Sequence, residues 1–367
     1  MNGQGRSAPG LGLAALLAVS WLLPAVSCDQ CSGLPPGWAL LRDNEPGALL
    51  SVQVKDGTVW VCGGDPDGVD GAATGTLLVD DDPLDDVDFT AIDTGLQGDF
   101  WWVHPTSDSV AFLGGSFGRV VRVDRGTSPP TIDVLPTPAT ALNDPDIIVF
   151  GVYASTAADG SDDVWAVGGR TGGAVGGFVW HKHGADDFVD VAIPSDVEGY
   201  AIWKVAGRGP DTVDDVWMVG TNGQTFHVEG EGAAATLVAV PTGLNTSLFT
   251  VDVDGSGAIA VGGLGRGLVV SRGTDAAEAW VDITPDGDNT PPLLGVHRGR
   301  DEGLIVGNAG AAYSVKDGVM TPEAFGFAMF QSLHGCFVDD DSGLVWAVGG
   351  QLTGIPLRGG VLLRRAP

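Results

Sequence analysis

The stretch DVWAVGG, at residues 163–169, decides the fold because six similar stretches occur elsewhere in the 367-residue chain. Each copy is a short apolar run that ends in glycine, and these glycines stand at positions 63, 114, 168, 220, 262, 307 and 349. Successive glycines are 42 to 54 residues apart, which is the period of propeller blades and not of helical solenoids. The sequence therefore predicts an all-β propeller with seven blades.

The flanks of each copy repeat as well. Around the fifth copy, the run LFTVD at 248–252 comes first, LVV at 268–270 follows, and WVDI at 280–283 comes last. Each run is short, rich in Val, Ile and Trp, and bounded by Gly, Asp or Pro, which favours strand over helix. We name the four expected strands of a blade a to d, from the axis outward. A radial arrangement of such sheets leaves few open sheet edges.

One pattern carries a resemblance to known proteins. The sequence DDVWAVG is followed by a turn and by the form apolar-x-His-x-x-Gly, as in TFHVEG at 225–230. This repeat resembles that of bacterial extracytoplasmic propellers related to the photosystem II assembly-factor propeller and to sialidase-like propellers. The resemblance spans nearly the whole chain after the N-terminal segment. It implies the fold but not the function, because propellers host unrelated activities. An intact sialidase Asp-box is absent, which argues against a glycosidase.

The N-terminal segment predicts export. Residues 1–27 contain one arginine, an apolar stretch at 11–23 and small residues at 25–27, which is typical of a secretory signal peptide. The sequence AVSC at 25–28 resembles a lipoprotein signal in which Ala replaces the usual Leu, so we expect a lipid on Cys28. Ordinary cleavage, with Cys28 and Cys31 in a disulfide or a tail, is the alternative. In either case, we expect residues 28–37 to be a short tether and residues 38–367 to form the propeller.

The strongly acidic composition limits the partners. The formal net charge is −29, which argues against binding to nucleic acid or to an anionic lipid surface. Only the lipid would join the chain to a membrane, and we expect a monomer whose partner is an envelope or extracellular protein. No motif of a nucleophile elbow, a phosphate loop or a zinc protease occurs. The preferred function is therefore a non-catalytic protein-binding or assembly module, and the alternative is a carbohydrate-binding or carbohydrate-active propeller.

Clusters of aspartate make Ca²⁺ a possible cofactor. Aspartate favours tight turns, so we interpret most of these residues as turn formers. The clusters at 65–71 and 80–86 nevertheless offer several oxygen ligands on flexible loops, which Ca²⁺ requires. A Ca²⁺ site at Asp65, Asp67 and Asp70 is the alternative, and no other cofactor is expected.

The order of strands predicts two unlike faces. The a–b and c–d turns lie on one face, and the a–b turns at 158–163, 211–215, 252–254 and 339–341 are rich in Asp; we call it the acidic-turn face. The b–c turns and the d–a loops at 136–146, 284–292 and 321–331 lie on the opposite, long-loop face. Loops on a rigid scaffold carry recognition, and Arg and aromatic residues are enriched in interfaces. The candidate binding residues are Arg119, Arg170, Arg266, Phe325, Phe327 and Phe330. The alternative is that the loops pack on one another and the arginines neutralise nearby Asp.

The a strands suggest polar groups near the channel. Alignment on a shared valine places Trp102, Lys204, Thr250 and His334 in one column, and His104, Tyr153, Asp252, His297 and Cys336 in the next. The resulting candidate polar ring is His104, Tyr153, Lys204, Asp252, His297 and His334. We interpret it as ordinary polar lining of a wet channel rather than as a metal or catalytic site. His181 and His227 stand where other blades have valine in strand c, so we interpret both as structural.

Two further predictions concern the joining of distant segments. Residues 38–42 have no place in the first blade, and the seventh copy has no fourth strand, so we expect residues 38–42 to pair with 361–365 and close the ring. Closing a long loop costs little more entropy than closing a short one.

Cys62 replaces an apolar residue of strand b and is expected to be buried. A disulfide from Cys62 to Cys336, across the closure of the ring, is a second hypothesis. Four cysteines allow three pairings.

Overall fold

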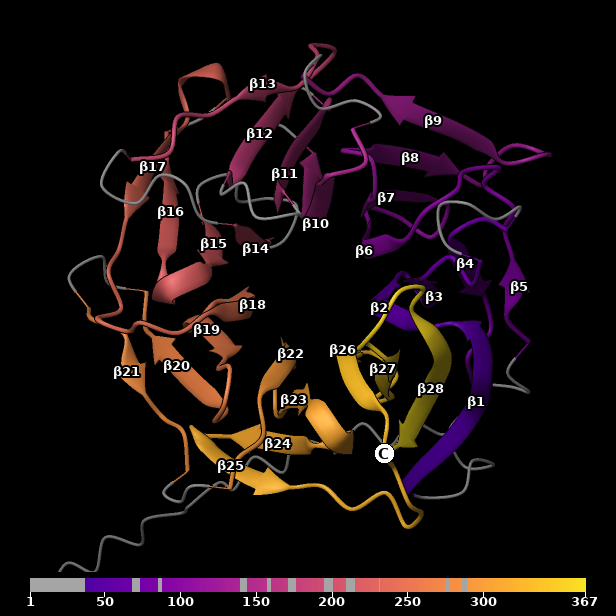
Figure 1. Ribbon diagram of the computed structural model, residues 1–367, viewed down its shortest axis with the longest axis vertical. Helices are drawn as coiled ribbons and strands as arrows, with labels where there is room; N and C mark the ends of the chain where they lie inside the picture. The colour runs from indigo at the N-terminus through magenta and orange to yellow at the C-terminus, as the bar shows by residue number, and fades with distance from the viewer. Residues whose placement is uncertain are drawn as a thin grey trace, which may run out of the picture.

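The computed structural model describes residues 37–67, 73–84, 88–138, 144–156, 160–170, 176–194, 201–208, 215–230, 232–274, 278–285 and 289–367. Seven four-stranded antiparallel sheets stand around a central axis (Figure 1). The predicted all-β, seven-bladed propeller is confirmed. The predicted signal peptide and the tether residues Cys28 and Cys31 lie outside the described residues. No helix among the described residues is long and apolar enough to cross a membrane.

Each blade contributes its strands in the order a to d. Blade 1 holds β2 (Leu49–Lys55), β3 (Thr58–Gly63), β4 (Thr76–Asp80) and β5 (Thr90–Ala91). Blade 2 holds β6 (Phe100–Pro105), β7 (Val110–Gly115), β8 (Val120–Asp124) and β9 (Thr131–Leu135). Blade 3 holds β10 (Ile147–Thr156), β11 (Asp162–Arg170), β12 (Phe178–His183) and β13 (Val189–Asp190). Blade 4 holds β14 (Ile202–Gly207), β15 (Val216–Gly220), β16 (Thr225–Glu229) and β17 (Thr236–Ala239).

The remaining blades follow the same order. Blade 5 holds β18 (Leu248–Asp254), β19 (Gly257–Gly262), β20 (Leu268–Arg272) and β21 (Val281–Asp282). Blade 6 holds β22 (Leu293–Arg298), β23 (Gly303–Gly307), β24 (Ala312–Lys316) and β25 (Val319–Pro322). Blade 7 holds β26 (Ser332–Val338), β27 (Val345–Gln351), β28 (Arg358–Ala366) and, as its outer strand, β1 (Gly37–Gly47). Single turns of 3₁₀ helix occur at η2 (Thr221–Gly223), η3 (Gly232–Ala234) and η4 (Asn308–Gly310).

The core lies between the blades. In β3, Val59 and Val61 pack against blade 7, whereas the alternate residues Trp60 and Cys62 pack against blade 2. Side chains alternate across a strand, so a strand b that is covered on both sides must be apolar at every position. Full burial of such side chains stabilises the fold by roughly 1.5–3 kcal/mol each. This explains the unbroken apolar runs of the repeat.

The glycine that ends each copy has a packing reason. A Cβ added at Gly168 would stand 2.0 Å from the carbonyl oxygen of Ile148, and the equivalent glycines at 63, 262 and 349 meet a backbone carbonyl at 2.0 to 2.1 Å. Strand b passes the start of strand a so closely there that no side chain fits. At Gly220 and Gly307 the carbonyl oxygen would be 2.7 and 2.4 Å away, and in blade 2 this position belongs to Gly115, whose added Cβ would stand 2.5 Å from Asp99 O, and not to Gly114. The repeat signature therefore records a close approach of two backbones, and the sequence alignment placed the glycine of the second copy one residue too early.

Every a strand carries a β-bulge near its start, where one residue has no partner in strand b. The bulged residues are Leu50, Trp101, Phe150, Trp203, Phe249, Leu294 and His334.

The pairing register of strands a and b in blade 7 corrects the sequence alignment of that blade. Cys336 pairs with Ala347 just as Val52 pairs with Val61, so Cys336 occupies the valine position. The column predicted for His334 and Cys336 was wrong by one residue, because blade 7 has no valine to mark the register.

The ring is closed by β1 and β28, as the sequence predicts. The pairing runs from Gly37 opposite Ala366 to Gly47 opposite Arg358 and is longer than the predicted five residues. Neighbouring side chains reinforce it. Trp38 Nε1 donates to Glu323 Oε2 at 2.9 Å, and Arg365 forms ion pairs with Glu302 and Glu323 of blade 6.

The hypothesis of a Cys62–Cys336 disulfide was wrong. Both residues are buried free thiols. Cys62 lies in the core between blades 1 and 2, where its Sγ donates to Phe100 O, and Cys336 lies in the core between blades 6 and 7, where its Sγ donates to Leu304 O. The two thiols point away from the interface that closes the ring.

We expect deletion of residues 38–42 to open the ring. The edge of β28 would lose its partner, which should lower the melting temperature by several degrees and promote association through the exposed edge. Calorimetry and size-exclusion chromatography would measure both effects. Deletion of residues 32–36 is the length-matched control. A 38–42 deletion as stable and as monomeric as wild type would show that β1 does not hold the ring closed.

Candidate functional site

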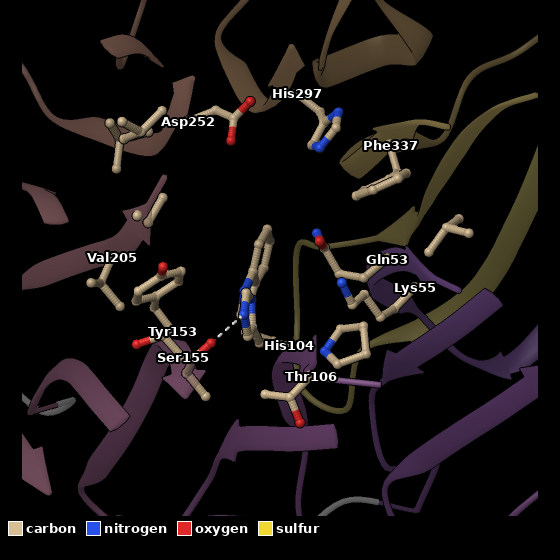
Figure 2. Close-up of a pocket in the computed structure, with 18 of the residues that line it drawn as sticks. Gln53, Lys55, His104, Thr106, Tyr153, Ser155, Val205, Asp252, His297 and Phe337 are labelled. Carbon is tan, nitrogen blue, oxygen red and sulfur yellow. Dashed lines mark hydrogen bonds between the residues drawn. The ribbon is translucent and has the colours of Figure 1, made fainter. Parts of the chain in front are cut away.

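A cavity of about 270 Å³ lies on the propeller axis, lined by the a strands of all seven blades (Figure 2). Each blade contributes the side chain that stands three residues after its bulge. These seven positions are Gln53, His104, Tyr153, Ala206, Asp252, His297 and Phe337. Since all seven strands share the bulge and the period of two, they bring the same position to the axis.

Four of the six residues of the candidate polar ring line the cavity, and two do not. His104, Tyr153, Asp252 and His297 point into the cavity (Figure 2). Lys204 and His334 do not line it, because they stand nearer to the start of their strands.

Lys204 is almost completely buried, with 3% of its surface exposed. Its Nζ donates to Phe150 O at 3.0 Å and lies 3.5 Å from the centroid of the Trp102 ring. Burial lowers the pKa of Lys204 to about 7. The carbonyl and the aromatic face stabilise the ammonium form, but they do not replace the water that burial removes.

His104 and His334 are neutral at pH 7. Burial lowers the pKa of His104 and that of His334 to about 4. His104 Nε2 donates to Ala154 O at 2.9 Å, and His334 Nδ1 donates to Leu50 O at 2.6 Å. His297 differs, because its Nδ1 accepts a hydrogen bond from Val338 N at 3.1 Å.

The cavity combines hydrogen-bonding groups with aromatic faces. Asp252 accepts from Arg298 N at 2.6 Å, and the Arg298 side chain pairs with Asp254 at the mouth. Trp102 and Phe337 supply aromatic surface. A small number of polar groups beside aromatic walls is the usual composition of a small-molecule site, and here it suits a hydroxylated ligand.

An aromatic collar, formed by bulged residues, marks the long-loop end of the channel. Ring centroids are 5.3 Å apart for Trp101 and Phe150, 4.7 Å for Phe150 and Trp203, 5.9 Å for Trp203 and Phe249, and 6.0 Å for Trp101 and His334. The β27–β28 loop adds Leu352 and Leu357, which pack with Trp101 and its neighbours. None of the bulged residues lines the cavity, so the cavity lies on the acidic-turn side of the collar. Sequence reasoning missed the collar, although bulky residues two positions before the shared valine were visible.

The three arginines of the candidate binding surface hold their own loops. Arg119 Nη1 donates to Gln97 O at 3.0 Å, and its guanidinium lies 4.5 Å from the centre of the Phe117 ring. Arg170 pairs with Asp144 at 2.9 Å, as the alternative interpretation expected. Arg266 Nη2 lies 3.5 Å from Pro285 O. The contacts with Gln97, Asp144 and Pro285 each join strand b or its b–c turn to a d–a loop on the long-loop face.

The aromatic residues of that surface differ in exposure. Phe325 packs edge-on against Trp38, with ring centroids 5.2 Å apart, whereas Phe327 is 36% and Phe330 82% exposed. Ile355 (94%) and Leu264 (72%) are exposed on b–c turns of the same face. Among the described residues, every other exposed large hydrophobic side chain lies on an outer strand: Leu40, Val134, Val189, Val238, Val281 and Val319. Apolar exposure in the described loops is thus confined to the long-loop face.

Of the expected calcium ligands, Asp65 uses its carboxylate within the protein. Asp65 is buried, its Oδ2 accepts from Gly98 N at 2.9 Å, and its Oδ1 accepts from Asp67 N at 3.0 Å. Asp70 lies outside the described residues. Asp65 therefore already ties the β3–β4 turn to the loop before β6, and calcium binding stays a prediction.

No model of a protein family matches the chain, and no curated protein does. The resemblance to assembly-factor and sialidase-like propellers therefore stays a prediction. The seven-bladed fold rests on the sheets themselves.

We expect Lys204 to make stability depend on pH. In the unfolded chain the Lys204 amine keeps its proton up to about pH 10.5, whereas in the folded chain it loses the proton at about pH 7. Between these two pH values the unfolded state binds more protons than the folded state, so the free energy of unfolding increases with pH. Relative to a Lys204→Met variant, wild type should gain up to about 1.4 kcal/mol per pH unit. Urea unfolding at pH 7, 8 and 9 would measure the difference. A constant difference across this range would contradict the buried-lysine assignment.

Proposed function

We propose that the protein is an exported, lipid-anchored propeller that binds another protein of the cell envelope through its long-loop face, without catalysis. The observation that carries this proposal is the confinement of Phe330, Phe327, Ile355 and Leu264 to the loops of one face. Exposed apolar side chains rimmed by polar residues mark binding surfaces. Arg266, in the same turn as Leu264, contacts Pro285 O at 3.5 Å, which supports a fixed position for that turn.

The first described residue lies at the outer rim of blade 7. Gly37 pairs with Ala366, and the next residue, Trp38, packs on Phe325 of the 321–331 loop. A tether that reaches the ring at Gly37 therefore arrives beside the start of that loop, and Phe330 and Ile355 remain exposed on the long-loop face.

We expect a Phe330→Ser, Ile355→Ser double variant to lose the partner. Truncation of central apolar anchors typically weakens binding by 2 kcal/mol or more, which is about 30-fold. Pull-down from envelope extracts, with quantitative mass spectrometry, would compare recovery by wild type and variant. The matched control is a Val189→Ser, Val281→Ser variant, since both valines are 57% exposed but lie on outer strands. Equal recovery by the face variant and wild type would refute the choice of face.

The axial cavity favours a second candidate function, the binding of a carbohydrate. Tyr153, Trp102 and Phe337 offer aromatic surface beside Asp252 and Gln53, which suits stacking on a sugar and hydrogen bonding to its hydroxyls. A glycan array would show a selective signal that is lost in a Tyr153→Ala variant and kept in the Phe330→Ser, Ile355→Ser variant. An array without signal for folded wild type would remove this candidate.

A further inference from the structure

A cluster outside the axial cavity brings together two histidines and an aspartate on blade 3. Asp163 opens the DVWAVGG stretch on β11, and His181 and His183 lie on β12. The sheet register pairs Asp163 with His183 and Trp165 with His181. Because His181 and His183 are two residues apart, their side chains leave the strand on the same side. The cluster lies where β11 begins and β12 ends, on the acidic-turn face.

The three side chains already converge on one point. His181 Nε2 lies 2.6 Å and His183 Nδ1 3.1 Å from Asp163 Oδ1, and the three potential ligand atoms are all within 4.8 Å of one another. The His181 ring is held in place by stacking on Trp165, with centroids 3.9 Å apart. This is the arrangement of a preformed set of metal ligands with only small adjustments left to make.

Asp163 is incompletely satisfied within the protein. Its side chain is 0% exposed, yet its Oδ2 has no hydrogen-bond partner. A buried carboxylate oxygen without a partner is costly, and such groups in native proteins call for an explanation. The His183 side chain is 38% exposed, so the cluster can be reached from solvent. A cation that enters from this side and is bound through both oxygens of the Asp163 carboxylate would satisfy Oδ2 as well as meet the two histidines.

Blade 4 has the same aspartate, tryptophan and first histidine as blade 3, but it lacks the second histidine. Asp215, Trp217 and His227 occupy the equivalent positions, and His227 Nε2 lies 3.6 Å from Asp215 Oδ1. There, however, Trp217 Nε1 donates to Asp215 at 2.9 Å and Arg208 lies 3.7 Å from it. The position of His183 is taken by Glu229. Blade 4 thus supplies its own cation to Asp215, whose side chain is 22% exposed.

Blade 3 offers no such cation from the strand itself. Lys182, between the two histidines, points to the other side and donates to the carbonyl oxygens of Gly184 and Asp186. The Trp165 Nε1 group, unlike that of Trp217, has no hydrogen-bond partner. The difference between the two blades is therefore a second imidazole in place of an internal positive charge.

We propose that Asp163, His181 and His183 bind a divalent transition-metal ion, with zinc as the best fit. Two imidazole nitrogens and one carboxylate oxygen form a common zinc ligand set, and a water on the exposed side of His183 would complete a tetrahedron. Ligands about 2.0–2.1 Å from zinc stand about 3.3 Å apart in that geometry. His183 Nδ1 already stands close to that separation from Asp163 Oδ1, whereas His181 Nε2, now 2.6 Å from the same oxygen, would have to move away from it. Ca²⁺ does not fit, since it prefers oxygen ligands.

The site would cross-link β11 and β12 at the acidic-turn face. His181 shares its place with valine in other blades, which is why sequence reasoning assigned it a structural role. The signal that was missed is the His-x-His spacing of His181 and His183 opposite the aspartate that begins the repeat. Only the pairing of β11 with β12 places that aspartate beside them.

The test is zinc binding by the full chain, measured in competition with a chromophoric chelator. We expect wild type to bind one equivalent more than a His183→Ala variant, or to bind that equivalent at least 10-fold more tightly. His227→Ala is the matched control and should bind as wild type does. Comparison between variants removes any contribution from Cys28 and Cys31, which all three proteins share. Zinc should also raise the melting temperature of wild type more than that of the His183→Ala variant.

Two further measurements keep the result decisive. Cobalt should give the visible absorption of a tetrahedral site in wild type and lose it in the His183→Ala variant. Because His183 is partly exposed, this variant should fold even if an Asp163→Asn variant does not. Identical zinc binding by wild type and the His183→Ala variant would overturn the proposal, and so would the absence of saturable binding at micromolar zinc. Loss of the same equivalent in the His227→Ala control would also overturn it.

Discussion

The structure depends on the pairing of β1 with β28. Each blade buries both of its faces against its neighbours, and no blade has a core of its own. The interface between blades 7 and 1 is therefore as important as the other six, yet it joins segments from opposite ends of the sequence. Backbone pairing from Gly37 to Gly47, together with the ion pairs of Arg365, fixes the outer edge of blade 7 and holds that interface in place.

The repeat made the fold predictable. Its glycine reports a backbone contact too close for a side chain, and its apolar run reports a strand covered on both sides, so both features had to recur in every blade. The closure was also predictable, because one segment was left without a place and one blade lacked a strand. These inferences needed only local patterns and a count of strands.

The site was predicted in part. His104, Tyr153, Asp252 and His297 could be placed at the axis because a shared valine set their register. His334 was misplaced because blade 7 has cysteine where the other blades have the shared valine, and the Lys204 ammonium is bound to Phe150 O of the neighbouring blade instead of facing the cavity. The contacts of Arg170 with Asp144 and of His183 with Asp163 depend on the positions of separate turns and strands. A repeat alignment carries no information on such contacts.

The two candidate surfaces lie on opposite sides of the collar of Trp101, Phe150, Trp203, Phe249 and His334. The cavity is lined by residues from the acidic-turn side of this collar and by none of the collar itself. A ligand in the cavity and a partner on the loops would therefore contact different residues of the same seven strands. The bulged residues stand between the two, so the a strands are the shared element through which one could influence the other.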